Sequence, residues 1–293
     1  MNAGETVERA LKEVVTKTHA PTCPPKLGSA LRYAVFPGGA RIRPRLCLSV
    51  AQACGGADEN LAVATAAALE LMHCASLVHD DLPCFDDADT RRDKPSVHKA
   101  FGESTAILVG DALIILAFET LAEAHAHTPQ RLAAAIRLLS RNTGVPMGIA
   151  AGQAWEAEDD IPLDTYHRAK TGALFAAATS LGAVAAGRDP EEWTTCGMLV
   201  GMAFQAIDDI RDVVGNPYRA SKPIQQDARH ERPNLALRMG PEAAKHKAAD
   251  LVEQSLLAIP ACPGRAHLIA TWRQQFQSLL PGTQTTPAAV QVA

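Results

Sequence analysis

Carboxylates are concentrated in two short runs of the sequence, and both runs have the residue types that bind metal ions. The first run, HDDLPCFDDADTRR, holds five carboxylates and two guanidinium groups within fourteen residues. The second run, FQAIDDIRD, follows about 120 residues later. Carboxylate sites without His or Cys ligands select hard cations, and Mg²⁺ in particular shares a few carboxylates with water and a substrate phosphate. The two runs therefore predict diphosphate chemistry at a magnesium site.

The second run lies inside an apolar segment, residues 196–214, that reads as a helix. Asp208 and Asp212 are four residues apart, and Gln205 is three residues before Asp208. This spacing predicts that the three side chains project from one helical face.

The first run directly follows the segment 61–78, which is apolar almost all the way round and so predicts a helix surrounded by other helices. Asp80 and Asp86 are six residues apart with Pro83 between them. Because proline removes a helical hydrogen bond, we expect the helix to end near Pro83 and the chain to turn Asp86 back toward Asp80. A solvated loop is the alternative interpretation of either acidic run alone, but it explains two runs at apolar helices less well.

The composition indicates the fold class that must position these residues. The chain has 293 residues, of which 47% are hydrophobic and only 4% aromatic, and alanine is abundant. Such a composition favours helix-on-helix packing over β-sandwiches and barrels. Pro and Gly punctuation separates about ten segments with helical period, and no alternating segment predicts a sheet. We therefore expect an all-α single domain over residues 1–280, with a loose tail at 281–293.

Charge and cysteine usage exclude several classes of protein. A net charge of −4 makes nucleic acid an unfavourable partner. The seven cysteines are scattered and form no Cys-x-x-Cys pair, which is typical of a reduced cytoplasmic protein and speaks against zinc. Residues 1–16 alternate charged and apolar side chains, so we expect no hydrophobic leader, and uninterrupted apolar stretches are far shorter than the roughly 20 residues of a membrane span. The sequence thus predicts a soluble protein without a membrane span.

The two acidic runs resemble the two aspartate-rich motifs of the trans-isoprenyl diphosphate synthases. DDLPCFD is similar to the longer form of the first motif, and FQAIDDIRD is similar to the second. The resemblance extends from Gly38 to about Leu280 and includes FGESTAILVGDAL, GQAWE and KTGALF. It is closest to the bacterial geranylgeranyl diphosphate synthases of carotenoid and photosynthetic pigment pathways.

The resemblance implies a helical bundle around a central cavity, a homodimer, and a defined reaction. The family ionises an allylic diphosphate, adds the double bond of isopentenyl diphosphate to the cation, and then loses a proton, which the departing diphosphate takes. Three Mg²⁺ ions bridge the allylic diphosphate to both motifs. Asp80, Asp86 and Asp208 are the implied metal ligands. Asp81, Asp209 and Asp212 are implied to complete the metal site through water or by orienting ligands.

The family's diphosphate contacts are implied to fall on cations beside the acidic runs, because guanidinium and ammonium groups match phosphate charge and geometry. The allylic diphosphate contacts are Arg91, Lys170 and Lys222. The isopentenyl diphosphate contacts are Arg43, His73 and Arg92. The residues that also face the forming carbocation are Lys170, Thr171 and Gln205. Without the family, Arg43 could equally be a surface charge and His73 a core histidine.

Small residues before the first motif predict the product length. Ala75 and Ser76 lie roughly one helical turn before Asp80, along the expected hydrocarbon tunnel. An aromatic residue there would close the pocket at farnesyl length, so the small pair predicts a C20 product. The alternative is that both are ordinary packing residues of an Ala-rich helix.

The sequence departs from the family pattern at three cationic positions. Ala40 stands where a lysine usually precedes Arg-x-Arg-Pro, Gln226 stands before Asp227 where a lysine is common, and Arg232 occupies a usual lysine position. Loss of rim cations predicts weaker diphosphate binding and a raised KM for isopentenyl diphosphate.

These departures leave three alternatives open. The chain could be a non-catalytic subunit of a heteromeric synthase, although both aspartate motifs are intact. It could be a class I terpene cyclase, although DDIRD replaces that class's Asn/Ser/Glu metal motif. It could also be the same enzyme stopping at farnesyl diphosphate.

Overall fold

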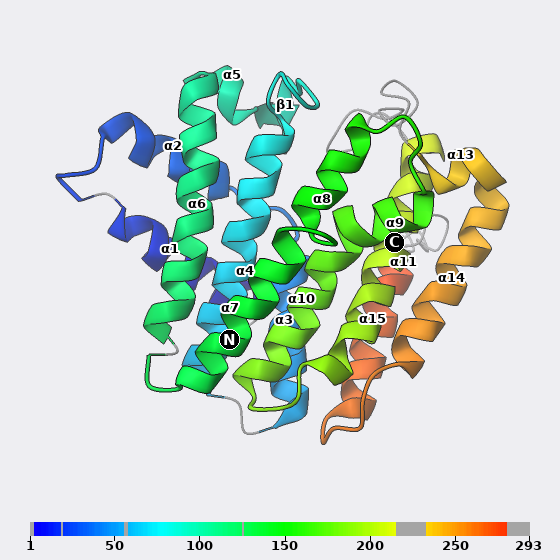
Figure 1. The fold of residues 1–293 in the computed structure, drawn as a ribbon. Coiled ribbons are helices and arrows are strands. Elements are labelled where there is room, and N and C mark those ends of the chain that lie inside the picture. The colour runs from blue at the N-terminus through cyan, green and yellow to red at the C-terminus, as the bar shows by residue number, and fades with distance from the viewer. Residues whose placement is uncertain (1–2, 19, 56–57, 125, 215–232, 280–293) are drawn as a thin grey trace, which may run out of the picture.

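The computed structural model describes residues 3–18, 20–55, 58–124, 126–214 and 233–279, and these residues form fourteen α-helices (Figure 1). The all-α prediction is confirmed. The helices are α1 (Ala3–Lys17), α2 (Pro25–Val35), α3 (Ile42–Cys54), α4 (Glu59–Asp80), α5 (Val97–Phe101), α6 (Glu103–Ala124), α7 (Pro129–Thr143), α8 (Ile149–Ala154), α9 (Leu163–His167), α10 (Ala173–Ala185), α11 (Glu191–Val214), α13 (Leu235–Met239), α14 (Pro241–Leu257) and α15 (Arg265–Leu279).

Several of these helices are single turns that the sequence pattern did not separate, so their number exceeds the ten expected. Two elements connect helices near the cavity: a 3₁₀ turn, η1 (Trp155–Ala157), and a π-helical turn, η2 (Arg168–Gly172). The described residues also contain a hairpin of two two-residue strands, β1 (Thr90–Arg91) and β2 (Lys94–Pro95), which the sequence did not predict. The expected tail at 281–293 lies outside the described residues.

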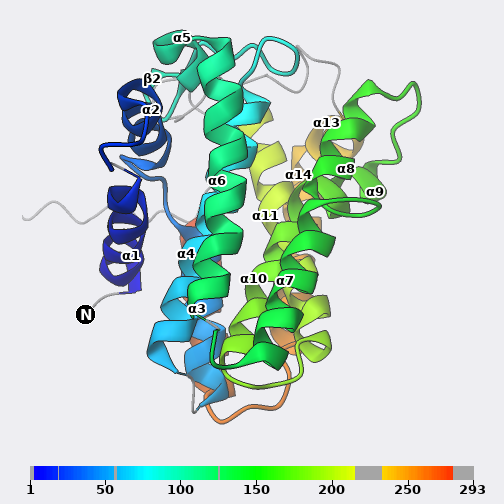
Figure 2. The same ribbon diagram turned by 60° about the vertical axis from the view of Figure 1, so that its left-hand side comes forward.

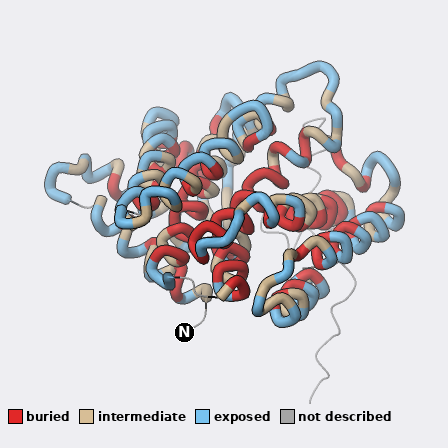
Figure 3. Tube along the Cα trace, turned by 60° about the horizontal axis from the view of Figure 1, so that its bottom comes forward, coloured by how far each residue is buried: buried red, intermediate tan, exposed pale blue. Residues whose placement is uncertain are grey.

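Long helices stand side by side, and the innermost ones are buried along most of their length (Figure 3). All thirteen residues of α10 are buried, and α4 buries most of its own, as its all-round apolar sequence predicts. The core is built largely from Ala, Leu and Val. Small side chains let neighbouring helices approach closely, so the alanine-rich composition serves this packing.

The bundle brings the two acidic runs to one end. The hairpin, α5 and α13 also gather at that end (Figure 1), beyond the last turn of α4. The chain between α11 and α13, which includes Lys222, Gln226 and Arg232, lies outside the described residues.

Two helices of the described part are long and apolar enough to cross a membrane by length and composition, α4 and α6. The prediction of no membrane span considered uninterrupted apolar stretches, whereas these two helices contain polar residues among their apolar ones. Within an apolar stretch of 18 residues in each helix, 72% of the residues are buried for α4 and 39% for α6. In Figure 2, α6 runs along the outside of the bundle in front of α4. The burial of α4 is that of a core helix, whereas α6 exposes large apolar side chains such as Ile107, Leu108 and Ile115.

Candidate active site

The first aspartate motif folds as a tight turn at the end of α4. The helix ends at Asp80, and the backbone N–H of Asp86 donates to the carbonyl oxygen of Asp80 at 3.0 Å. The N–H of Leu82 donates to His79 and that of Phe85 to Leu82, which closes the turn around Pro83. The expected return of Asp86 toward Asp80 is confirmed.

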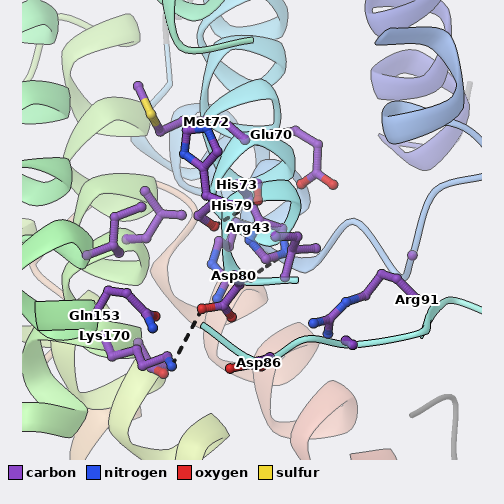
Figure 4. A pocket seen from close by; sticks show the side chains of 18 of the residues that line it. Arg43, Glu70, Met72, His73, His79, Asp80, Asp86, Arg91, Gln153 and Lys170 are labelled. Carbon is purple, nitrogen blue, oxygen red and sulfur yellow. Dashed lines mark hydrogen bonds and ion pairs between the residues drawn. The ribbon is translucent and has the colours of Figure 1, made fainter. Parts of the chain in front are cut away.

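The environment of Asp80 is unfavourable for a carboxylate without a cation. Burial raises the pKa of Asp80, and nearby Asp86 raises it further, whereas Lys170 opposes both effects. The Lys170 ammonium lies 3.7 Å from Asp80 Oδ1 (Figure 4). A group whose charged form is disfavoured by burial and by a like charge gains most from a bound cation.

Asp81 points away from the cavity and holds Arg91. Its side chain is 2% exposed, and Arg91 Nε donates to Oδ1 at 2.9 Å while Nη2 donates to the same oxygen. Arg91 lies on β1 and lines the cavity, so the hairpin and Asp81 together aim this guanidinium. Burial raises the pKa of Asp81 despite the ion pair.

The π-helical turn η2 presents Lys170 and Thr171 to the cavity on consecutive positions. Such turns insert one residue per turn and are frequent at functional sites. The turn packs against α8 at Gly152, where a Cβ would lie 2.4 Å from the Lys170 Cα. Glycine at this position thus allows the close approach of the two elements.

Glu156 of η1 organises the polar groups beside Lys170. It accepts hydrogen bonds from Tyr166 Oη at 2.6 Å and from Gln153 Nε2 at 2.8 Å, and it forms an ion pair with Lys170. Glu156 belongs to GQAWE, a part of the family resemblance for which no role was predicted. Gln153 is three residues before Glu156, but Tyr166 and Lys170 are ten and fourteen residues after it, so local spacing does not indicate these two partners.

A second polar chain leads from the cavity wall into the protein. Thr171 Oγ1 donates to Gln205 Oε1, and Gln205 Nε2 donates to Asp209 Oδ1 at 2.7 Å. Asp209 is 1% exposed, and its Oδ2 accepts from the N–H of Leu235 at the start of α13 at 2.7 Å. Asp209 therefore fixes the amide of Gln205 so that its carbonyl oxygen is on the Thr171 side.

Arg43 of α3 and His73 of α4 meet in the cavity wall, about two helical turns before Asp80 on the same helix. Arg43 Nη1 lies 3.2 Å from His73 Nε2, and the guanidinium carbon lies 4.5 Å from the ring centroid of Phe175. Arg43 Nε is buried and has no hydrogen-bond partner among the described residues. Burial lowers the pKa of Arg43 to about 10, and burial with the neighbouring arginines holds the pKa of His73 well below its usual value. The pair is thus a cation beside a neutral imidazole.

One cavity of about 1710 Å³ contains nearly all the predicted site residues. Its polar rim includes both walls described above, and its interior is lined by apolar groups such as Met72, Ile114 and Leu174. In Figure 4, Met72 lies at the opposite end of the view from Asp86. The predicted residues that line it are Arg43, His73, Ala75, Ser76, Asp80, Asp86, Arg91, Arg92, Lys170, Thr171, Gln205 and Asp208. The cavity can therefore receive a ligand with a charged head and an apolar chain.

Three of the predicted site residues that the structure describes are not among those that line the cavity. Asp81, Asp209 and Asp212 are all buried in the protein, and the first two orient Arg91 and Gln205. Lys222 lies outside the described residues. Phe204, to which the sequence analysis assigned no role in the site, also lines the cavity.

The donor set fits hard cations, because Asp80 and Asp86 at the end of α4 and Asp208 on α11 bring carboxylate oxygens to the cavity. Among the described residues, no three His, Cys, Asp or Glu side chains converge on one point. A few carboxylates on two walls suit an ion that also takes oxygens from water and from a phosphate.

The fold and this cavity define the class of the protein. A family model described as polyprenyl synthetase matches residues 24–264. The chain belongs to this family, which confirms the resemblance of its aspartate motifs.

Individual relatives are similar over almost the whole chain. The chain is 50% identical over 275 residues to the geranylgeranyl diphosphate synthase of Cereibacter sphaeroides, covering 94% of this chain and 96% of that protein. It is 49% identical over 268 residues to the geranylgeranyl diphosphate synthase of Rhodobacter capsulatus, covering 92% and 93%.

A solved structure supports the fold. The geranyltransferase of Helicobacter pylori, complexed with magnesium and isoprenyl diphosphate, superposes with a TM-score of 0.81 at 29% identity, covering 94% of this chain and 96% of that chain.

Proposed function

We propose that this chain is a prenyltransferase that condenses isopentenyl diphosphate with farnesyl diphosphate, or with shorter allylic primers, to give geranylgeranyl diphosphate. Arg43 is the observation that carries the proposal. It is a cation in the cavity wall whose buried Nε has no hydrogen-bond partner among the described residues, and it lies beside His73, whose pKa burial holds well below its usual value. A desolvated guanidinium is costly without an anion, and a diphosphate offers a bidentate partner. The names of the relatives at about 50% identity support the same activity.

Mg²⁺ is the cofactor that we propose, with Asp80 and Asp86 on one wall and Asp208 on the other as its ligands. The magnesium and isoprenyl diphosphate of the Helicobacter pylori geranyltransferase support this assignment. When bound, Mg²⁺ supplies Lewis-acid stabilisation of the departing diphosphate. We propose three ions, as the family resemblance implies.

The chain's own residues divide between the two substrates. Lys170 and Arg91 bind the allylic diphosphate, with Lys222, and Arg43, His73 and Arg92 bind isopentenyl diphosphate. The oxygens of Thr171 and Gln205 face the carbon that becomes cationic, and their dipoles stabilise the positive charge. Asp209 holds the Gln205 amide in that orientation.

A C20 product is favoured over C15 by the small wall residues below Asp80. Ala75 and Ser76 both line the cavity, whose apolar interior continues past them to Met72. The farnesyl-forming alternative would need a bulky group at this level. Because the similar Helicobacter pylori structure is named a geranyltransferase, the test below includes the farnesyl-forming alternative as an outcome.

We further propose that residues 1–280 act as one synthase domain and that the protein works in the cytoplasm. We also propose that it forms a homodimer, with α6 at the interface. This helix exposes Ile107, Leu108 and Ile115 by 46%, 56% and 66%, although it is one of the most apolar helices of the bundle. A second copy burying this face would remove these side chains from water. Sedimentation of the purified protein measures the assembly, and a monomer would contradict it.

The activity is tested by incubating the purified protein with Mg²⁺, radiolabelled isopentenyl diphosphate and farnesyl diphosphate, and then sizing the products. A C20 product supports the proposal. Turnover of geranyl but not farnesyl diphosphate would identify a farnesyl diphosphate synthase. Absence of any condensation would favour a non-catalytic subunit, and a cyclised hydrocarbon would identify a terpene cyclase.

A further inference from the structure

A buried guanidinium stands directly behind the loop that carries the proposed isopentenyl diphosphate contacts. Arg41 is 5% exposed and immediately precedes α3, with a left-handed backbone φ of 50°. Its Nε donates to Glu8 Oε1 on α1 at 2.7 Å, and its Nη1 donates to Glu70 Oε1 on α4 at 2.6 Å. Its Nη2 donates to the carbonyl oxygen of Val35, at the end of α2, at 2.8 Å. One side chain therefore ties three helices to the start of a fourth.

These contacts commit Arg41 to the protein rather than to a ligand. Burial by itself lowers the pKa of this guanidinium, but hydrogen bonds and ion pairs with Glu8 and Glu70 raise it overall. Glu70 is 1% exposed, so a loss of either charge in this pair would leave the other buried and uncompensated. Arg41 is thus unavailable to replace the cation that is missing at Ala40.

The position of Arg41 restricts the glycine pair that precedes it. A Cβ at Gly38 would lie 2.2 Å from the guanidinium carbon of Arg41, and a Cβ at Gly39 would lie 3.2 Å from Nε of Arg92. Two guanidinium groups thus lie against adjacent glycines of one loop. Arg43 projects into the cavity wall two residues after Arg41. A shift of Arg41 would therefore move the backbone of residues 38–43, which positions the side chain of Arg43 and lies against the guanidinium of Arg92.

The anchor of this loop lies partly on α1, which precedes the residues 24–264 that the family model matches. Val7, Leu11 and Val15 dock α1 into the core with exposures of 0%, 0% and 1%. In Figure 2, α1 lies beside the bundle below α2. Glu8 follows Val7 directly, so the docking of α1 delivers its carboxylate to Arg41.

We propose that Glu8, Arg41 and Glu70 form a positioning triad for the isopentenyl diphosphate loop, and that α1 is thereby part of the support of the active site. Arg41 and Glu70 border the cavity, but their charged groups are paired with each other, so the triad is assigned no direct contact with a substrate. It acts by holding the backbone of residues 38–43 in the geometry from which Arg43 reaches His73. This inference rests on the proposed assignment of Arg43 and Arg92 to isopentenyl diphosphate.

The test is Glu8→Gln in the full chain, with Glu13→Gln as the matched control on the exposed side of α1. Steady-state kinetics are measured with each substrate varied in turn. We expect Glu8→Gln to raise the KM for isopentenyl diphosphate about tenfold, with kcat and the KM for farnesyl diphosphate within about twofold, because ground-state binding at one subsite is weakened. Glu13→Gln should match the wild type in all three values.

A purely structural role would not give this split between substrates. Equal changes in both KM values, or none, would overturn the inference while the wild type remains active. An inactive wild type would overturn the proposed function, and this inference with it. If Glu8→Gln does not fold, Glu8→Asp retains the charge with a shorter reach, and it should raise the same KM by a smaller factor. An unchanged KM in Glu8→Asp with a lowered melting temperature would also overturn the inference.

Discussion

Replacing Ser76 by Phe tests whether the depth of the apolar cavity sets the product length. Ser76 is half-buried, lines the cavity, and donates from Oγ to the carbonyl oxygen of His73 at 2.8 Å. It lies four residues before Asp80, so the new ring would stand about 6 Å along the helix axis from the proposed metal ligands. At that depth it would occupy space that the end of a farnesyl chain needs.

The magnitude follows from the burial of one isoprene unit. Five carbons at about 0.8 kcal/mol each give roughly 4 kcal/mol of lost apolar burial if the last unit of farnesyl diphosphate is excluded. This corresponds to a fall in kcat/KM for farnesyl diphosphate of up to about a thousandfold. Geranyl diphosphate, one unit shorter, should change by less than about tenfold on the same reasoning. The radiolabelled product should therefore shift from C20 to C15.

The matched control is Ser76→Ala, which loses only the Oγ hydrogen bond and should still give C20. If Ser76→Phe elongates farnesyl diphosphate to C20 at close to the wild-type rate, the reasoning about depth is refuted. Ala75→Tyr is a less clean probe, because Ala75 is fully buried in the helix wall and an inserted ring there costs about 1–3 kcal/mol in stability. Its effect on product length would be mixed with an effect on folding.

Three further substitutions test the polar part of the site. Asp80→Asn should lower kcat/KM by at least about a hundredfold, more than typical losses from groups behind a metal ligand; near-normal turnover at saturating Mg²⁺ would contradict the assignment. Ala40→Lys should lower the KM for isopentenyl diphosphate by about tenfold or more, since a charge-assisted contact contributes about 1.5–3 kcal/mol; an unchanged KM in substrate titrations would show that another cation serves there. His73→Gln should reduce the loss of stability on acidification, measured as urea midpoints at pH 7 and pH 5. Because the pKa of folded His73 lies well below that of the unfolded side chain, the unfolded state binds the proton first and wild-type stability falls as pH drops below about 6.5; equal pH dependence in both proteins would argue against a neutral His73.

The parts of the fold that sequence predicted are those controlled by local rules. An apolar surface on every side of residues 61–78 can only be satisfied inside a bundle, and α4 is buried accordingly. The break at Pro83 follows from a missing N–H, and the turn that returns Asp86 to Asp80 is its local consequence. The same rules placed Gln205 and Asp208 on a common face, and both line the cavity.

The parts that sequence could not predict depend on partners far along the chain. Helical spacing groups Asp212 with Asp208, yet Asp212 is 7% exposed and lies off the cavity, because spacing gives a direction but not what covers a side chain. Glu156 gained its role only when η1 and the π-helical turn brought it to Lys170. Nothing in the run RIRPRL distinguishes Arg41 from the other arginines, because its partner Glu8 lies on α1, far away in the sequence. In each case tertiary packing, not residue type, decides the function.

The charges around the two proposed subsites differ, and this difference predicts that the two substrates depend on divalent metal to different degrees. At the proposed allylic subsite, the cations Lys170 and Arg91 are already paired with the carboxylates Glu156 and Asp81, and Asp80 and Asp86 add further negative charge. An anionic diphosphate cannot bind such a wall favourably unless divalent cations reverse its sign. At the proposed isopentenyl diphosphate subsite, Arg43 lies beside His73, whose pKa burial lowers, so a bound anion would compensate a buried charge directly. Chelation of divalent metal should therefore abolish binding of the allylic substrate while leaving much of the affinity for isopentenyl diphosphate, and calorimetric titration of each diphosphate in the presence of a chelator measures both.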